Sequence, residues 1–288
     1  LGSPDDNESR EAKERLMNGG VGVIPSLIKG LDDTSAEVRR MSTWVLRQLS
    51  HQFKLIPHEM IAREIARRLR SETDERTKME MISSLQDYAC PTAVRELKHY
   101  STDDPSSRVR KHATHLVARA AQDPANEIDF FHKQRGDKSL AVQLAADYEL
   151  TLMGEKHGHA LALRTMKNSP YDWDEQTEAF MVLGANGEAA DLPFLQNIWR
   201  STEEDGWRRV AALDAYREVQ LAQVPPAQRL DYLIKMLDDP SEPEREWAAY
   251  YHLWNYSDPN TSARLKKYLD EKGHLGYAQA SNALSLRK

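Results

Sequence analysis

The chain has 288 residues, 40% of them hydrophobic and 29% charged, so it is long enough to bury a sizeable apolar core. Its 13 glycines and 13 prolines are ordinary counts, which excludes a collagen-like or disordered chain. A single cysteine excludes an internal disulfide framework and a Cys-rich zinc module.

The charge is unevenly distributed along the chain. The overall net charge is −6, which argues against a dedicated nucleic-acid binder. Between residues 39 and 119, however, 16 Lys and Arg stand against 10 Asp and Glu, whereas residues 120–288 carry 19 against 27. An elongated protein built in this order has a basic first part and an acidic second part.

The first residues are interpreted as a remnant of cloning. Leu1-Gly2-Ser3 is typical of the scar of a cleaved fusion tag, so residues 1–15 are assigned to the scar and an N-terminal lead-in. Residues 16–288 are predicted to form one domain.

No apolar run approaches the roughly 20 residues of a membrane span, so no membrane-spanning helix is expected. The compartment is unknown, with the cytoplasm favoured.

From residue 23 onward one pattern recurs: an amphipathic segment, an Asp-rich turn and a second helix start. Residues 23–31 and 229–237 space their apolar residues by three and four, as a helix with one buried face does. The turns carry Asp and Ser, which cap free N–H groups, and often proline. Four turns align without gaps, starting at Asp33, Asp104, Thr202 and Asp239. The alignment puts Arg39, Arg110, Arg208 and Arg245 in one column, and Ser42, Ala113, Ala211 and Ala248 three residues later.

Weaker copies of the pattern fill the gaps. They span residues 61–85, with Arg76 in the arginine column, and 128–150, 160–183 and 263–286. The copies recur every 31 to 38 residues, a spacing typical of helical repeat proteins. The sequence therefore predicts an all-α fold, a right-handed α-solenoid (superhelix) of about seven to eight helical hairpins.

The repeats resemble the HEAT family, in particular the short HEAT-like repeats of phycobiliprotein lyase subunits. The likeness rests on the Asp-Asp-Pro turn at 103–105, the Val109-Arg110 step and Ala113. The resemblance implies that the aspartate and arginine columns form a structural, hydrogen-bonded ladder between stacked repeats. The predicted ladder residues are Asp33, Arg39, Asp104, Arg110, Arg208, Asp239 and Arg245. Residues 128–183 lack the arginine column, so regular stacking is less secure there.

The search for chemistry finds no phosphate loop, zinc-protease helix or nucleophile elbow. His58-Glu59 resembles one iron-binding pair of the HEAT-like deoxyhypusine hydroxylases, but it stands alone and is interpreted as a solvated helix start. His157 and His159 could offer zinc two imidazoles, yet without an evident third ligand a loop is the preferred interpretation. Cys90 is interpreted as a buried thiol. No catalytic residue, metal or cofactor is predicted.

Binding is predicted on the concave face, which in HEAT-like stacks the second helix of each hairpin lines. The outward positions there are partly basic, which suits an acidic partner or a phosphate backbone. A cluster of aromatic residues near residue 250 should contribute anchors, with Trp247 and Tyr251 packed inward. The predicted contact residues are Arg40, Arg47, Lys111, Arg209, Tyr216, Tyr250 and Trp254.

Three functions compete. A non-catalytic scaffold or adaptor that binds a protein partner, acidic where it meets the N-terminal half, is favoured because solenoids offer extended surfaces. Nucleic-acid binding through the basic repeats of residues 39–119 is disfavoured by the net charge. A lyase or chaperone-like subunit rests on the family likeness alone. The cations proposed for nucleic acid are Arg40, Arg47, Arg63, Arg67, Arg68 and Lys111.

Overall fold

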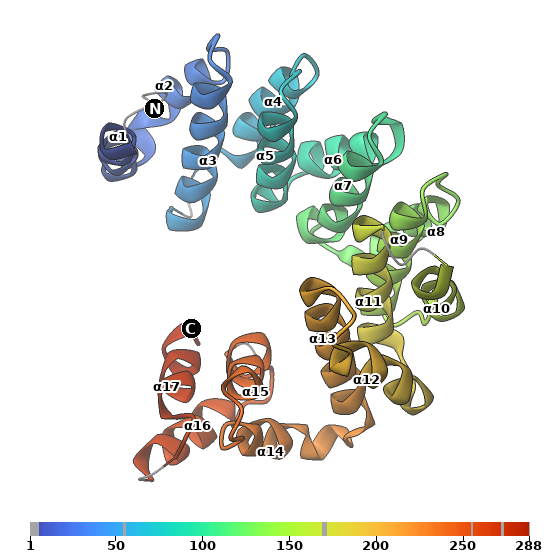
Figure 1. Cartoon of the computed structure of the whole chain (residues 1–288). Coiled ribbons are helices and arrows are strands. Elements are labelled where there is room, and N and C mark those ends of the chain that lie inside the picture. The colour runs from blue at the N-terminus through green and yellow to red at the C-terminus, as the bar shows by residue number, and fades with distance from the viewer. Residues whose placement is uncertain (1–5, 54–55, 169–171, 255, 272–273, 288) are drawn as a thin grey trace. The chain divides into compact units, whose positions relative to one another are not determined.

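The computed structural model describes residues 6–53, 56–168, 172–254, 256–271 and 274–287, with side chains from residue 11 onward. Every regular element in these ranges is a helix, and Figure 1 shows their succession. None of the described helices combines the length and the apolar character that a membrane crossing requires. The fold is the predicted all-α solenoid of hairpins; its handedness stays a prediction.

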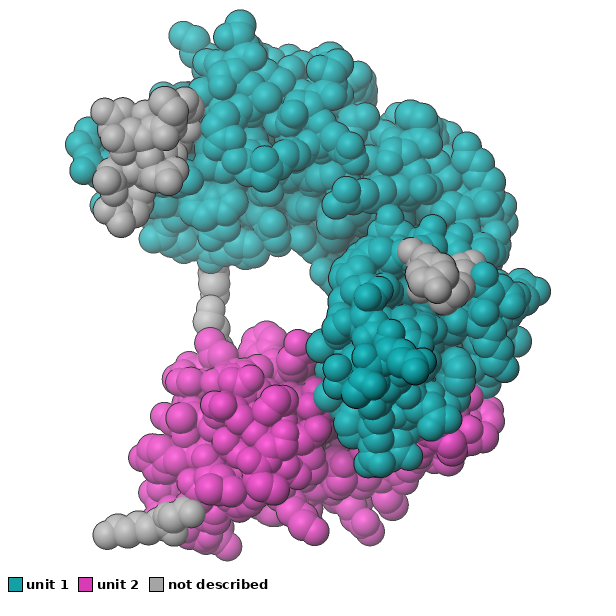
Figure 2. Space-filling view, in the orientation of Figure 1, with its two compact units in different colours: residues 1–187, 194–215 teal, residues 188–193, 216–288 magenta. Residues whose placement is uncertain are grey.

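The described residues group into two compact units, coloured separately in Figure 2. Unit 1 contains residues 1–187 and 194–215, and unit 2 contains residues 188–193 and 216–288. The single domain over residues 16–288 stays a prediction.

Unit 1 begins with a lone helix and continues as a row of hairpins. Its elements are α1 (Asp6–Asn18), η1 (Gly20–Val23), α2 (Ile24–Gly30), α3 (Ala36–Gln52), α4 (His58–Leu69), α5 (Glu75–Leu85), η2 (Gln86–Tyr88), α6 (Pro91–Asp103), α7 (Ser107–Ala120), η3 (Pro124–Glu127), α8 (Ile128–Gln134), α9 (Leu140–Leu152), α10 (His159–Asn168) and α11 (Trp173–Asn186). Three further elements follow near the division between the units: η4 (Ala189–Asp191), α12 (Leu192–Arg200) and α13 (Gly206–Gln223).

Local capping by a side chain marks the start of three of the second helices, α3, α5 and α11. Ser35 accepts a hydrogen bond from the Val38 amide, and Asp74 accepts one from Thr77, at the N-termini of α3 and α5. Asp172 caps α11 in the same way. Each cap satisfies an N–H group that has no partner inside the helix. The Asp- and Ser-rich turns of the sequence thus define the hairpins.

The second helices of unit 1 stack in order: α3 packs against α5, α5 against α7, α7 against α9, and α9 against α11. The first helices α2, α4 and α6 form a parallel row. One apolar core runs through these hairpins from Ile24 to Leu150. Each hairpin covers the apolar stripe of the next one, which is the packing of a repeat protein. We call the side formed by α3, α5, α7, α9 and α11 the inner face.

Unit 2 has its own core, which includes Leu233, Trp247 and Ala280. Its last elements are α14 (Pro226–Met236), α15 (Glu242–Glu246), η5 (Trp247–Leu253), α16 (Thr261–Asp270) and α17 (Tyr277–Leu286). The segment η5 is a π-helix, closed by an i to i+5 bond from the Trp254 amide to the Ala249 carbonyl. It packs against α14 and α17.

Candidate partner-binding surface

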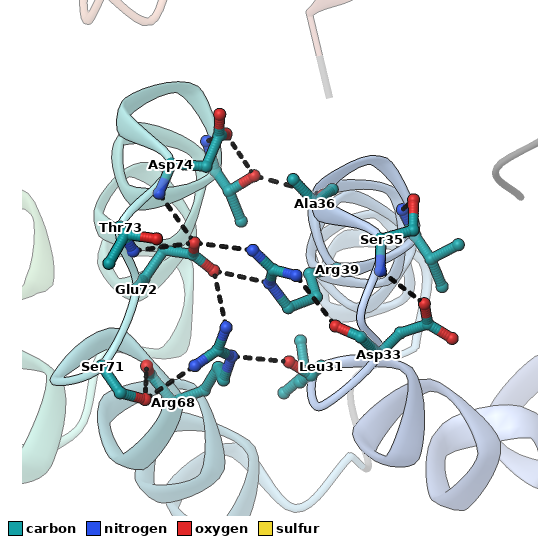
Figure 3. A network of polar contacts seen from close by, with 12 residues as sticks. Leu31, Asp33, Ser35, Ala36, Arg39, Arg68, Ser71, Glu72, Thr73 and Asp74 are labelled. Atoms are coloured by element: carbon teal, nitrogen blue, oxygen red, sulfur yellow. Dashed lines mark hydrogen bonds and ion pairs between the residues drawn. The ribbon is translucent and has the colours of Figure 1, made fainter.

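A ladder of buried charges joins the first hairpins at their turns. Arg39 donates through Nε and Nη2 to both carboxylate oxygens of Glu72, at 2.7 and 2.8 Å (Figure 3). Its Nη1 donates to the Asp33 carbonyl at 2.8 Å. Because both charged side chains are buried, each depends on the other for its counter-charge. The pair joins the turn before α3 to the turn before α5.

The same arrangement repeats at α7. Arg110 binds both oxygens of Asp137 at 2.9 Å and the Asp104 carbonyl at 2.9 Å. The intervening step is made by Lys78, whose Nζ lies 3.2 Å from Asp104. In each case the cation is the fourth residue of a second helix, and the carboxylate precedes the N-cap of the next second helix by two residues.

This register corrects one part of the alignment. The sequence comparison placed Arg76 in the arginine column, but α5 starts at Glu75, so Lys78 occupies the fourth position. Arg76 is exposed instead. The alignment failed because an arginine in the first turn resembled the expected residue, while the cap at Asp74 decides the register.

The other predicted ladder residues make different contacts. The carboxylates of Asp33, Asp104 and Asp239 accept the amide two residues further on, at 2.8 to 2.9 Å. Arg245 donates to the Asp239 carbonyl at 2.7 Å. Arg208 is the third residue of α13 and reaches back to Gln176 and the Met166 carbonyl, both at 3.3 Å.

The ladder ends at α9, where the fourth residue is the neutral Gln143. Its amide donates to the Asp137 carbonyl of its own turn at 2.6 Å. In α11 the fourth residue is again a glutamine, Gln176. The missing arginine column of residues 128–183 is therefore a real change in how the hairpins are joined.

On the inner face, a cluster of charged side chains joins α7, α9 and α11. His115 on α7 lies 2.8 Å from Glu149 on α9 and 2.9 Å from Glu178 on α11. Lys111, one turn earlier on α7, lies 2.5 Å from Asp174. Burial alone would lower the pKa of His115, but Glu178 and Glu149 raise it to about 9. We call His115, Lys111, Glu149, Asp174 and Glu178 the inner seam.

A groove lies on the inner face between α3, α5 and α7, before the inner seam. Its volume is about 350 Å³, and it is lined by Arg40, Glu75, Arg76, Met79, Glu80, Ser83, Arg108 and His112. Arg76 and Arg108 are each the second residue of their helix and are exposed. Neither makes an ion pair or hydrogen bond within the described part of the chain. Sequence analysis did not select them as contact residues.

Two titratable groups lie at the floor of this groove. Burial and the neighbouring charges of His115 and Lys111 lower the pKa of His112 to about 4, so the ring is neutral at neutral pH. His112 Nε2 lies 2.7 Å from Ser83 Oγ. A base with so low a pKa activates a hydroxyl poorly, so this contact does not support nucleophilic chemistry. Burial raises the pKa of Glu80.

The predicted contact cations, three on the inner face and Arg209 on α13, are engaged within the chain. Arg40 pairs with Glu37 and Arg47 with Asp87, both at 2.6 Å, and Lys111 belongs to the inner seam. Arg209 is exposed and donates to the Trp199 carbonyl at 3.2 Å. Their role in partner binding stays a prediction.

The predicted aromatic contacts differ in exposure. Tyr216 is half-buried and accepts a hydrogen bond from Gln220, and the Tyr250 hydroxyl accepts one from Asn282 on α17 at 3.0 Å. Trp254 is 38% exposed. Trp247 is buried as expected, but the prediction for Tyr251 is wrong, since it is 64% exposed. The helices that pack against η5, α14 and α17, cover Trp247 and leave Tyr251 exposed.

The cations considered for nucleic acid on the first helices are also paired. Arg63 bonds to Glu59, Arg67 to Asp32, and Arg68 to the Leu31 carbonyl, at 2.6 to 3.0 Å. Hydrogen bonds from Thr92 and Cys90 lower the pKa of Glu59 to about 2, which ties this carboxylate to the start of α6. Glu59 thus joins α4 to α6, whereas His58 Nδ1 lies 3.0 Å from the Tyr88 carbonyl of η2.

The family model for HEAT repeats matches residues 24–118, from the start of α2 to the last turn of α7. The chain is an α-solenoid, and residues 24–118 are HEAT repeats, as predicted. The likeness to phycobiliprotein lyase subunits stays a prediction. No curated protein matches the sequence.

Proposed function

We propose that the chain is a non-catalytic scaffold that binds a protein partner, and that the groove between α3, α5 and α7 receives an acidic segment of that partner. The observation that carries the proposal is the pair Arg76 and Arg108. Both are exposed on neighbouring repeats, and neither is neutralised by an ion pair within the described residues. Arginine forms two-pronged bonds with carboxylates, so two such side chains suit an extended acidic peptide.

The composition of the groove favours a peptide over a nucleic acid. Two glutamates, Glu75 and Glu80, lie among its three arginines, and Met79 adds apolar contact. A phosphate backbone carries a charge at every nucleotide and would meet both carboxylates, whereas a peptide can place uncharged residues opposite them. Arg63, Arg67 and Arg68, which a nucleic acid would need, are already bound to groups of the chain. Alternating charge with an apolar contact is the pattern of a protein interface.

The double variant Arg76→Glu/Arg108→Glu tests the proposal. Both side chains are exposed and unpaired, so the reversal should leave the circular dichroism spectrum unchanged. The probe is a fluorescent peptide of alternating Glu and Ala, measured by anisotropy at low and moderate salt. We expect wild-type binding that weakens with salt and is lost in the variant. In an affinity pull-down from the source lysate, the double variant should retain less protein than the wild type.

The matched control reverses two exposed lysines of α16, which is not part of the inner face: Lys266→Glu/Lys267→Glu changes net charge by the same amount. This control should keep peptide binding. Equal losses in both variants would show a general charge effect and contradict the groove. Binding of a random duplex with a steep salt dependence, without peptide binding, would favour the nucleic-acid function instead.

A further inference from the structure

We propose that His132, Glu155 and His157 form a binding site for one divalent transition-metal ion of the zinc class. His132 lies on α8, whereas Glu155 and His157 lie in the loop between α9 and α10. Their ligand atoms all lie within 4.8 Å of one another. Sequence analysis paired His157 with His159 and found no third ligand, because the other two ligands become neighbours only when α8 and this loop pack together.

The two imidazoles converge on the carboxylate. Both imidazoles direct Nε2 at the same carboxylate oxygen, Glu155 Oε2, at 3.0 Å from His132 and 3.1 Å from His157. The two rings stand nearly perpendicular, with centroids 5.5 Å apart. Two imidazoles and one carboxylate are a known zinc ligand set, which leaves a fourth position for water. Nitrogen ligands favour zinc and its transition-metal neighbours over magnesium and calcium.

The loop that carries two of the ligands has a defined conformation. Gly154 and Gly158 flank it with φ of +94° and +80°, values that L residues rarely adopt. The Glu155 amide donates to the Leu150 carbonyl, and the buried Asn186 donates to the His157 carbonyl at 2.8 Å. A Cβ at Gly158 would lie 2.6 Å from Asp147. The ligands are thus held by backbone contacts that do not depend on the ion.

The surroundings allow a cation to enter and stay. The three side chains are about one-third exposed, so an ion reaches them from solvent. Arg135, three residues after His132, forms an ion pair with Asp147 at 2.7 Å, and this pairing reduces its repulsion of a bound cation. A bound ion would connect α8 with the start of α10, where the arginine ladder is missing. The site is independent of the proposed peptide groove, which lies on other helices.

Calorimetric titration of zinc sulfate into the chelator-treated chain, without a polyhistidine tag, tests the site. We expect one ion per chain, a thermal midpoint raised by several degrees, and the visible absorption of four-coordinate Co²⁺ when cobalt replaces zinc. His157→Ala and Glu155→Gln should each weaken binding at least about tenfold, since loss of even an outer-shell partner costs 10- to 100-fold. Glu155→Gln keeps the shape of the side chain, so it separates ligand loss from misfolding.

His99→Ala is the matched control, because His99 is a half-exposed histidine that bonds to Asp103 of its own helix α6. Its zinc binding should equal that of the wild type. The proposal is overturned by the absence of saturable binding at one ion per chain. Binding that persists unchanged in His132→Ala/His157→Ala would overturn it as well.

Discussion

The hairpins from α2 to α7 and those from α8 to α11 share one continuous row of second helices, yet different polar contacts join them. In the first group a cation at the fourth position of each second helix binds a carboxylate of the next turn, as Arg39 does with Glu72. In the second group glutamines replace the cations, and His115 instead bridges Glu149 and Glu178 on the inner face. Apolar burial therefore holds the hairpins together in both groups. The accompanying ion pairs lie at the turns in the first group and on the inner face in the second.

The largest expected effect breaks the ladder at its last step. Arg110→Met leaves the carboxylate of Asp137, 9% exposed, without its counter-charge and should lower the free energy of unfolding by about 3–5 kcal/mol. Urea unfolding followed by circular dichroism measures it. Arg108→Met, two residues earlier and exposed, should change it by less than about 0.5 kcal/mol. Similar effects of the two variants would show that the ladder does not stabilise the stack.

The next effect belongs to the inner seam. The pKa of His115 is raised to about 9 by Glu178 and Glu149, so the folded chain holds this proton when the unfolded chain has lost it. The stabilisation is complete below pH 6.5 and disappears as the pH rises through 9, by on the order of 3 kcal/mol. Unfolding measured across this range should show the loss in the wild type and not in His115→Gln. Parallel pH profiles would contradict the charged bridge.

His112, one turn away on the same helix, should behave in the opposite way. Burial lowers its pKa to about 4, so between pH 6.5 and 4 the ring is protonated in the unfolded chain but neutral in the folded chain. Stability should fall by about 2 kcal/mol as the pH drops from 6.5 to 4, and His112→Gln should remove this part of the loss. NMR titration of the two rings measures the same difference directly. If both rings titrate near 6.5, neither environment is as described.

The smallest effect concerns close helix approach in the first hairpin. A Cβ at Gly30 of α2 would lie 2.3 Å from Ser42 Oγ on α3. Gly30→Ala should lower the free energy of unfolding by about 1 kcal/mol. This is the low end for overpacking, because the Ser42 hydroxyl can rotate away. Ser42→Ala in the same chain should recover most of the loss, which thermal unfolding can show. Gly22→Ala, where a Cβ meets no atom within 4 Å, serves as the control.

The sequence predicted helices, turns and repeat length because their causes lie within a few residues. Apolar residues at spacings of three and four produce one buried stripe, and Asp or Ser before a helix caps its first turn, as Ser35 does. The register of α5 was missed because Arg76 resembles the arginines of the other repeats. The N-cap at Asp74 sets the start of the helix and places Lys78 at the fourth position instead. The exposure of Tyr251 was missed because it depends on which helices pack against η5, namely α14 and α17, and the local pattern does not contain that information.

By itself, therefore, the sequence determined a helical repeat with its turns, since hydrogen bonds within one helix or turn depend on near neighbours. Only the tertiary structure decided which charges meet. Arg39 and Glu72 are 33 residues apart, and His115 and Glu178 are 63 apart. His132 meets Glu155 and His157 in the same way, because α8 and the loop after α9 pack side by side. Such encounters follow from the stacking of hairpins, which the local pattern within one hairpin does not reveal.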